Sequence, residues 1–169
     1  MRFAIRPAVV GHAEGIARAH TASWRTSYRG ILPDDVLARI DIDQRAASWH
    51  RVIQDPAVLT LVAYDTSHGD IVGLCDAGRN RSRTRHAGEI YRLYFEHHAR
   101  RHGLGRDMFE HVTDWLRAQR MASLVIWVLD GNHHARRFYE AMGGALGPRI
   151  GSRVSGHPVV EQAYVWDSI

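Results

Sequence analysis

The sequence predicts an α/β fold of the α+β type, with a mixed, mostly antiparallel sheet of about six to seven strands and flanking helices. Two observations favour this class. Apolar, β-branched stretches alternate with segments of helical periodicity, and three of the predicted strands follow one another with only turns between them. A chain of 169 residues with 45% apolar content can bury one core, so we predict a single domain over residues 1–169.

The first half of the chain is predicted to contain a strand, three helices and three consecutive antiparallel strands. A strand near residues 3–5 leads into a helix over residues 11–28, along which Ile16, His20, Trp24 and Tyr28 share one face. A second helix opens at Asp34-Asp35, and Asp43 is expected to cap a third that ends near residue 54. The three strands are expected at residues 58–64, 71–77 and 89–95.

The second half is predicted to alternate helix and strand and to end in two strands. Apolar residues at helical spacing from Met108 to Leu116 indicate an amphipathic helix over residues 103–120. A compact apolar strand at residues 123–129 precedes a helix at residues 132–142, which Gly143-Gly144 closes. The last strands are expected near residues 146–154 and 159–166.

Composition restricts the classes of function. All 22 basic residues are arginine and they are interleaved with 18 acids, which differs from the basic stripe typical of nucleic-acid-binding proteins. The alternating arginines of residues 79–85 could recruit an acidic partner, but without interleaved aromatics we interpret them as a solvated turn and predict no nucleic-acid partner. The lone Cys75 is expected in the core. No apolar run has the length of a membrane span or the context of a signal peptide, so we expect a soluble, cytoplasmic protein without a membrane partner.

The twelve histidines do not predict a metal site. Adjacent histidines, as in His97-His98 and His133-His134, project in different directions, and the segment from His98 to His102 crosses a glycine turn. The helical i,i+4 spacing of a zinc-binding pair is therefore not expected there. We predict no metal.

A glycine-containing turn between a strand and a helix suggests the chemistry. Gly103-x-Gly105 opens the amphipathic helix, whose first turn offers backbone N–H groups without helical partners and the positive end of the helix dipole. Arg100, Arg101 and Arg106 can add charge-assisted bonds to phosphate. The turn lacks the features of a P-loop or of a dinucleotide fold. Taken alone, its glycines could also merely relieve backbone strain.

Two motifs resemble the GNAT superfamily of acetyl-CoA-dependent N-acetyltransferases. Leu93-Tyr94-Phe95 followed by Arg100-x-x-Gly103-x-Gly105 is similar to the family's Arg/Gln-x-x-Gly-x-Gly/Ala motif. Residues 132–143, Asn-His-His-Ala-Arg-Arg-Phe-Tyr-Glu-Ala-Met-Gly, resemble its Asn-x-x-Ala-x-x-Phe-Tyr-x-x-x-Gly helix. The element order is also that of the family, so the resemblance covers nearly the whole chain. Gly144 departs from the phenylalanine often found there, which puts the local packing in question.

The resemblance implies acetyl-CoA as cosubstrate, held where two strands splay apart. These strands would be residues 91–95 and 123–128. The backbone of Leu93 and Phe95 would bond the pantetheine arm, and the turn from Arg101 to Arg106 would hold the pyrophosphate. The implied cofactor-binding residues are Leu93, Tyr94, Phe95, Arg100, Arg101, His102, Gly103, Leu104, Gly105, Arg106, Asn132, Ala135 and Phe138.

Amine acylation needs a neutral nitrogen, yet an alkylamine has a pKa near about 10.4, so a base must remove its proton. Glu89 is the predicted base, directly or through a water, although it could instead pair with a surface arginine. By resemblance Tyr139 is the general acid for the departing thiolate, unless its hydroxyl only orders the thioester. Trp24 and Tyr28, one and two turns after His20, are predicted to shape the acceptor pocket, with core packing as the alternative.

The predicted function is transfer of an acetyl group from acetyl-CoA to a primary amine of a small molecule or peptide, directly within a ternary complex. Two other functions are compatible with the residues. A non-catalytic acyl-CoA-binding module would not need Glu89 and Tyr139, and a nucleic-acid-binding protein would show steep salt dependence and no affinity for CoA. The identity of the acceptor stays open, and the resemblance also allows a homodimer formed through the late strands.

Overall fold

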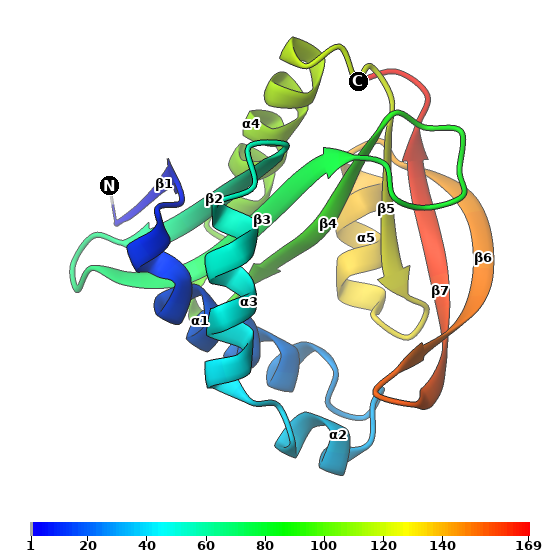
Figure 1. Cartoon of the computed structure of the whole chain (residues 1–169). Coiled ribbons are helices and arrows are strands. Elements are labelled where there is room, and N and C mark those ends of the chain that lie inside the picture. Colours follow the sequence, from blue (N-terminus) through cyan, green and yellow to red (C-terminus); the bar gives the residue numbers. More distant parts are fainter. Residues whose placement is uncertain (1) are drawn as a thin grey trace.

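A computed structural model describes residues 2–169, which form a seven-stranded sheet with helices on both faces (Figure 1). The strand order is β1-β2-β3-β4-β5-β7-β6, and all neighbours pair antiparallel except the parallel β4 and β5. This confirms the predicted mixed, mostly antiparallel sheet. The strands are β1 (Phe3–Pro7), β2 (Val58–Asp65), β3 (Asp70–Arg79), β4 (Gly88–Phe95), β5 (Leu124–Leu129), β6 (Ala145–Val154) and β7 (His157–Trp166).

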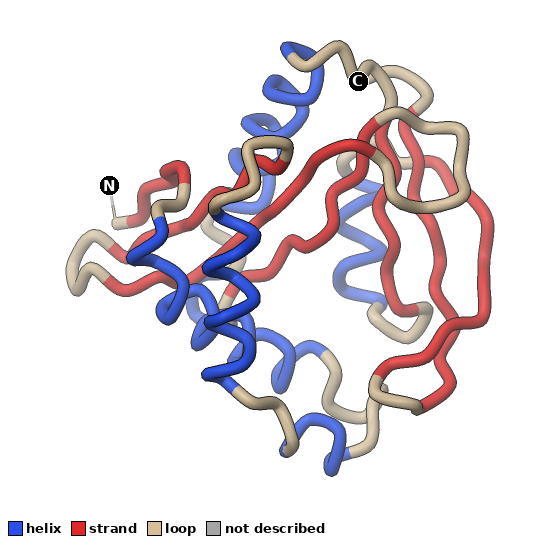
Figure 2. Tube along the Cα trace, viewed as in Figure 1, coloured by secondary structure: helices blue, strands red, loops and turns tan. Residues whose placement is uncertain are grey.

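The helices cover the sheet in two layers, as the tube in Figure 2 shows. They are α1 (Ala13–Ser27), α2 (Asp34–Ala38), α3 (Ile42–Ile53), α4 (Leu104–Ala118) and α5 (His133–Ala141), with short 3-10 turns at Val10–His12 and His97–Ala99. On β2, Leu61 and Ala63 pack in the cluster that contains α4, whereas Val62 between them packs with α1 and α3. This alternation is the period of two that a strand imposes on side chains buried on both faces.

The residue that caps α3 differs from the prediction, which named Asp43. The Asp41 side chain accepts a hydrogen bond of 2.9 Å from the backbone N–H of Gln44, and its extended backbone (φ −87°, ψ 114°) lets the carboxylate reach that group. Asp43 lies inside the first turn of the helix, where its negative charge interacts favourably with the helix dipole but its side chain does not cap the helix. The prediction of Asp43 as the cap was therefore wrong by two residues.

The parallel strands β4 and β5 pair at only three positions, Gly88–Leu124, Glu89–Val125 and Ile90–Ile126. Beyond Ile90 each strand continues without the other, so their facing edges separate. This confirms the splayed pair that the resemblance implied. The part of β5 that borders the gap is shorter than expected, because residues 124–126 remain paired with β4 and the gap begins at Trp127.

The ring of Trp166, on the last strand, explains why a glycine occupies position 144. A Cβ atom on Gly144 would lie 2.8 Å from Cζ2 of Trp166, and the Trp166 indole N–H donates a 3.0 Å hydrogen bond to the Met142 carbonyl. Trp166 thus fills the space next to the helix end, and a side chain at position 144 would collide with it. Cys75 is fully buried in the core, as predicted, and no helix within residues 2–169 is long and apolar enough to cross a membrane.

Candidate active site

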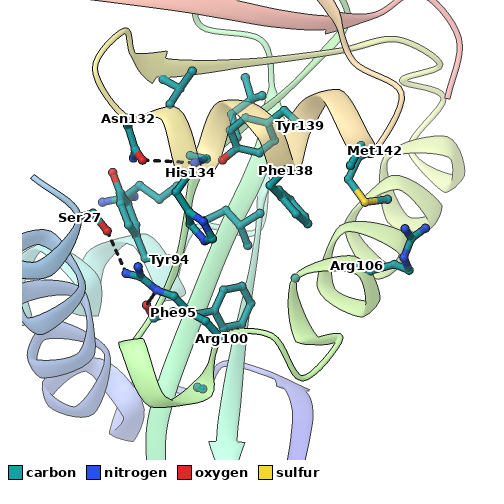
Figure 3. Close-up of a pocket in the computed structure, with 18 of the residues that line it drawn as sticks. Ser27, Tyr94, Phe95, Arg100, Arg106, Asn132, His134, Phe138, Tyr139 and Met142 are labelled. Carbon is teal, nitrogen blue, oxygen red and sulfur yellow. Dashed lines mark hydrogen bonds between the residues drawn. The ribbon is translucent and has the colours of Figure 1, made fainter.

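A cavity of about 330 Å³ opens where β4 and β5 separate (Figure 3). Its walls are the end of β4, the end of β5, the turn before α4 and the inner face of α5. The predicted cofactor-binding residues that line it are Leu93, Tyr94, Phe95, Arg100, Arg101, Gly103, Gly105, Arg106, Asn132, Ala135 and Phe138. Tyr139 and Tyr28 also line this cavity, so it joins a predicted catalytic residue to a predicted acceptor residue.

The backbone of β4 offers free polar groups to the gap. The Glu96 N–H donates to the Val72 carbonyl of β3 at 2.8 Å, and because hydrogen-bonding direction alternates along a strand, Leu93 and Phe95 direct their backbone groups away from β3. On that side β5 has already diverged. The Phe95 carbonyl accepts a 3.0 Å bond from Nε of Arg100, which leaves the Phe95 N–H and the two polar groups of Leu93 for a ligand.

The turn before α4 is shaped to bind an anion. Arg101 and Gly103 both have positive φ angles, 67° and 85°, and no side chain caps the helix at Gly103. The first N–H groups of α4 are therefore available at the positive end of its dipole. Gly105 packs closely on α5, since an added Cβ would lie 3.1 Å from Cε2 of Phe138. The two motifs meet at this contact.

Positive charge surrounds the mouth of the cavity. Arg100 is half-buried, with Nη2 3.0 Å from the Ser27 hydroxyl oxygen, so it ties the end of α1 to the end of β4 (Figure 3). Burial lowers the pKa of this guanidinium. Burial also lowers the pKa of His134 on α5, and the nearby Arg100, Arg137, Arg101 and His97 lower it further. An anionic ligand would relieve this accumulation of like charge.

Tyrosine hydroxyls gather on the α1 side of the same cavity. The Tyr28 and Tyr94 oxygens are 2.7 Å apart. Burial raises the pKa of Tyr28, and the neighbouring Tyr94 and Tyr139 add to the rise. Burial raises the pKa of Tyr139 well above its usual value, with Tyr94 and Cys75 adding to the effect. The Tyr139 hydroxyl is therefore protonated throughout the physiological range and can only donate or accept hydrogen bonds there.

Glu89 lies at the paired start of β4 and does not line the cavity. Its Oε2 accepts hydrogen bonds from the backbone N–H groups of Arg81 (2.7 Å) and Ser82 (3.1 Å). Burial raises the pKa of its carboxyl group, and these two bonds only partly offset the rise. Within residues 2–169 it forms no ion pair with an arginine, so the alternative predicted for it is not observed. The carboxylate instead holds the loop between β3 and β4.

The predicted acceptor residues form an aromatic cluster between α1, α3 and β4. The Trp24 ring stands edge-on to Tyr28 with centroids 4.9 Å apart, and His20 lies 5.0 Å from the Tyr94 ring. Tyr28 reaches the cavity, whereas Trp24 lies behind it. His20 is buried, and burial together with Arg45 and Arg92 lowers its pKa to about 2.

Two predicted cofactor residues have side chains outside the cavity. His102 is exposed and its ring centre lies 5.1 Å from that of Phe3, while Leu104, the first residue of α4, has its side chain buried in the core. Only their backbone N–H groups could reach an anion at the turn. Asn132 is the N-cap of α5, because its Oδ1 accepts a 3.3 Å bond from the Ala135 N–H.

Sequence reasoning missed several residues that line the cavity. Arg92 and Tyr91 lie between the predicted residues of β4, and Trp127 lies on β5 at the point where the gap begins. Ser27 and His134 also line it, at the end of α1 and in the first turn of α5. His134 occupies an unspecified position of the second motif, which could have pointed to it, whereas Arg92 lies outside both motifs. Among residues 2–169, no three His, Cys, Asp or Glu side chains gather in a way that could hold a metal ion.

Comparisons with known proteins match this arrangement. A profile of the acetyltransferase (GNAT) family matches residues 14–144. The uncharacterised N-acetyltransferase YuaI of Bacillus subtilis (strain 168) is 26% identical over 129 residues, which span 76% of this chain and 72% of YuaI.

Solved structures show the same fold. The PaiA N-acetyltransferase of Thermoplasma acidophilum in complex with coenzyme A superposes with a TM-score of 0.72 at 16% identity, over 96% of this chain and 98% of that one. The structure of yncA from Salmonella typhimurium with its cofactor acetyl-CoA superposes with a TM-score of 0.73 at 19% identity, over 98% of this chain and 94% of that one.

Proposed function

Because the chain belongs to the acetyltransferase (GNAT) family, we propose that it transfers an acetyl group from acetyl-CoA to a primary amine, directly within a ternary complex. The observation that carries the proposal is the meeting of three features at one cavity. These are the free strand edge of β4, the uncapped N-terminus of α4 and the buried hydroxyl of Tyr139. A polyanionic ligand with a long polar arm fits the first two, and a reacting group at the end of that arm would meet the third.

The residues around the cavity fit acetyl-CoA in their chemistry. The Leu93 and Phe95 backbone groups would bond the amides of the pantetheine arm, and the first N–H groups of α4 with Arg101 and Arg106 would hold the pyrophosphate. When bound, acetyl-CoA supplies a thioester whose carbonyl carbon is open to attack by an amine. Arg100 instead stabilises the wall of the cavity, because its Nε donates to the Phe95 carbonyl and its Nη2 donates to the Ser27 hydroxyl oxygen.

We assign Glu89 the role of base, acting through water. Its raised pKa makes the carboxylate a better proton acceptor than an ordinary glutamate, and its place outside the cavity requires an intervening water. As the amine nitrogen forms its bond to the acetyl carbon, the proton it loses passes through that water to the Glu89 carboxylate. The bond between that carbon and the sulfur breaks, and its electron pair stays on the sulfur.

Tyr139 is proposed as the donor to the departing sulfur. Its high pKa keeps the hydroxyl protonated, so it can donate a hydrogen bond while negative charge develops. A thiol has an ordinary pKa of about 8.5, so complete transfer of the tyrosine proton to a thiolate would be uphill. Most of the contribution is therefore the hydrogen bond, and the thiolate takes its final proton from solvent.

The test is release of free thiol from acetyl-CoA by a panel of amines, measured for the wild type and for Tyr139→Phe. We expect the variant to lose about tenfold to a hundredfold in turnover, in line with one lost hydrogen bond to developing charge, at nearly unchanged affinity for acetyl-CoA. Equal turnover would remove the donor role. Tight binding of CoA by the wild type without any turnover would instead identify a non-catalytic acyl-CoA-binding module.

A further inference from the structure

The loop between β3 and β4 exposes an arginine at every second position. The odd-numbered positions of residues 79–85 are the four arginines that the sequence singled out, and all four are exposed. The even-numbered residues 80–86 lie on the inner side, where three are half-buried and His86 is buried. This alternation gives the loop a polar inner side and a basic outer side.

The inner side holds the loop in one conformation. Asn80 is bonded at both ends of its amide, since its Nδ2 donates to the Thr84 carbonyl at 3.1 Å and its Oδ1 accepts from the Ser82 N–H at 2.7 Å. The loop, at the upper right of Figure 1, also reaches the chain after β7, where Asp167 accepts a 2.8 Å bond from Nη2 of Arg85. A partner that binds the outer side therefore has little loop entropy to overcome.

Three of the four arginines carry charge that no acid matches. Arg85 pairs with Asp167, but Arg79, Arg81 and Arg83 form no ion pair within residues 2–169. Guanidinium groups offer pairs of donors in the geometry that carboxylates accept. The basic surface formed by these three arginines therefore suits a partner that carries more than one carboxylate.

Arg81 connects the basic surface to the cavity. Its guanidinium lies 3.8 Å from the centre of the Tyr91 ring, and Tyr91 lines the cavity. Its backbone N–H donates to Glu89, the proposed base, at 2.7 Å. Because Tyr91 contacts both places, an amine in the cavity and an anion at Arg81 lie within the reach of about two to four residues of an extended chain.

We propose that the acceptor is an acidic peptide, whose amine enters the cavity and whose carboxylates, about two to four residues away, bind Arg81 and Arg83. The proposal rests on the proposed acetyl transfer and names its substrate class. A nucleic acid fits less well, because residues 79–87 offer no exposed aromatic ring on which bases could stack. A basic peptide or a polyamine would be repelled by the same arginines.

The test compares three peptides as acceptors for acetyl-CoA. Each has one free amine, and the second and third residues after it are both glutamate, both glutamine or both arginine. The amine is the N-terminus in one series and a lysine side chain in another. At low salt we expect the glutamate peptide to exceed the glutamine peptide about fivefold to tenfold in kcat/KM, chiefly through KM, as for two exposed ion pairs. In about 1 M salt, where the Debye length is about 3 Å, most of this preference should disappear.

Arg81→Gln combined with Arg83→Gln should remove the preference. The ratio between the two peptides cancels any effect that loss of the Arg81 charge has on the pKa of Glu89. Arg6→Gln is the matched control and should keep the preference. Arg6 is also exposed and lies 5.6 Å from the centre of the Tyr64 ring, but it belongs to β1, which β2 and β3 separate from β4.

Equal or better use of the glutamine or arginine peptides would overturn the proposal. An unchanged preference in the double variant, or tighter binding of a single-stranded oligonucleotide than of the glutamate peptide, would do the same. Fluorescence anisotropy of the labelled glutamate peptide with the CoA-saturated protein separates these results from a failure of the proposed function. Binding that requires Arg81 and Arg83 without acetylation would refute acetyl transfer and support the basic surface. Acetylation that ignores the glutamates would refute the basic surface alone, and neither binding nor acetylation would refute both.

Discussion

Acidification from pH 7 to pH 5 should destabilise the protein through His20. In the folded state burial, with Arg45 and Arg92, lowers the pKa of this imidazole to about 2 from an ordinary value of 6.5. Below pH 6.5 the unfolded chain takes up a proton that the native state does not, so stability is lost as the pH falls from that value. At pH 5 the difference is about 1.5 pH units, or about 2 kcal/mol of unfolding free energy.

The assay is urea unfolding at pH 7 and at pH 5 for the wild type and for His20→Asn. The asparagine carbonyl can still accept the Trp49 N–H bond but cannot titrate, so other groups contribute equally to both proteins. The wild type should lose about 2 kcal/mol more than the variant between the two pH values. Equal losses would refute the assignment of a neutral, buried His20.

Three further predictions concern the loop, the turn and the helix end. Glu89→Gln keeps an acceptor for the Arg81 and Ser82 N–H groups but cannot take up a proton. Turnover, measured by thiol release, should therefore fall about a hundredfold or more, while the affinity for acetyl-CoA, measured by calorimetry, should stay unchanged. Unaltered turnover would exclude Glu89 as the base. Arg101→Asn keeps a residue that tolerates the positive φ angle but removes a charge, and calorimetry should show about tenfold weaker CoA binding with a smaller dependence on salt. Gly144→Ala should lower the free energy of unfolding by about 1–3 kcal/mol in urea titrations, because its Cβ would lie 2.8 Å from Trp166 and 3.0 Å from the Tyr139 carbonyl oxygen; an unchanged value would show that Trp166 can move.

The sheet, and many of the residues that line the cavity on β4, α5 and the turn before α4, could be predicted from the sequence because their signals are local. Periodicity over a few residues is enough to place a strand or a helix. Each of the two motifs also lies on one short stretch of chain, and the fold brings the two stretches into contact at Gly105 and Phe138. Even the error at Asp43 is local, since either of two nearby aspartates could cap α3 and only the extended backbone at Asp41 decides between them.

The acceptor side could not be predicted because it depends on contacts between distant residues. The stacking of Arg45 on Trp24, and the hydrogen bond from the Trp49 N–H to Nδ1 of His20, depend on how α3 packs against α1. No spacing in the sequence encodes these contacts. The packing of Trp166 against Gly144 is a contact of the same kind, because it joins the end of β7 to the residues that follow α5. The resemblance indicated that something was missing after the helix but not what replaced it.

The most direct test of the central claim is calorimetric titration of CoA into the wild type and into Ala135→Trp, which places a large ring where α5 lines the cavity. Ala47→Trp, on the exposed side of α3, is the matched control for the added ring. We expect one CoA to bind each wild-type and Ala47→Trp chain, and binding to be lost in a folded Ala135→Trp protein. Absence of binding to the wild type, or equal binding to all three proteins, would contradict the placement of CoA between β4 and β5.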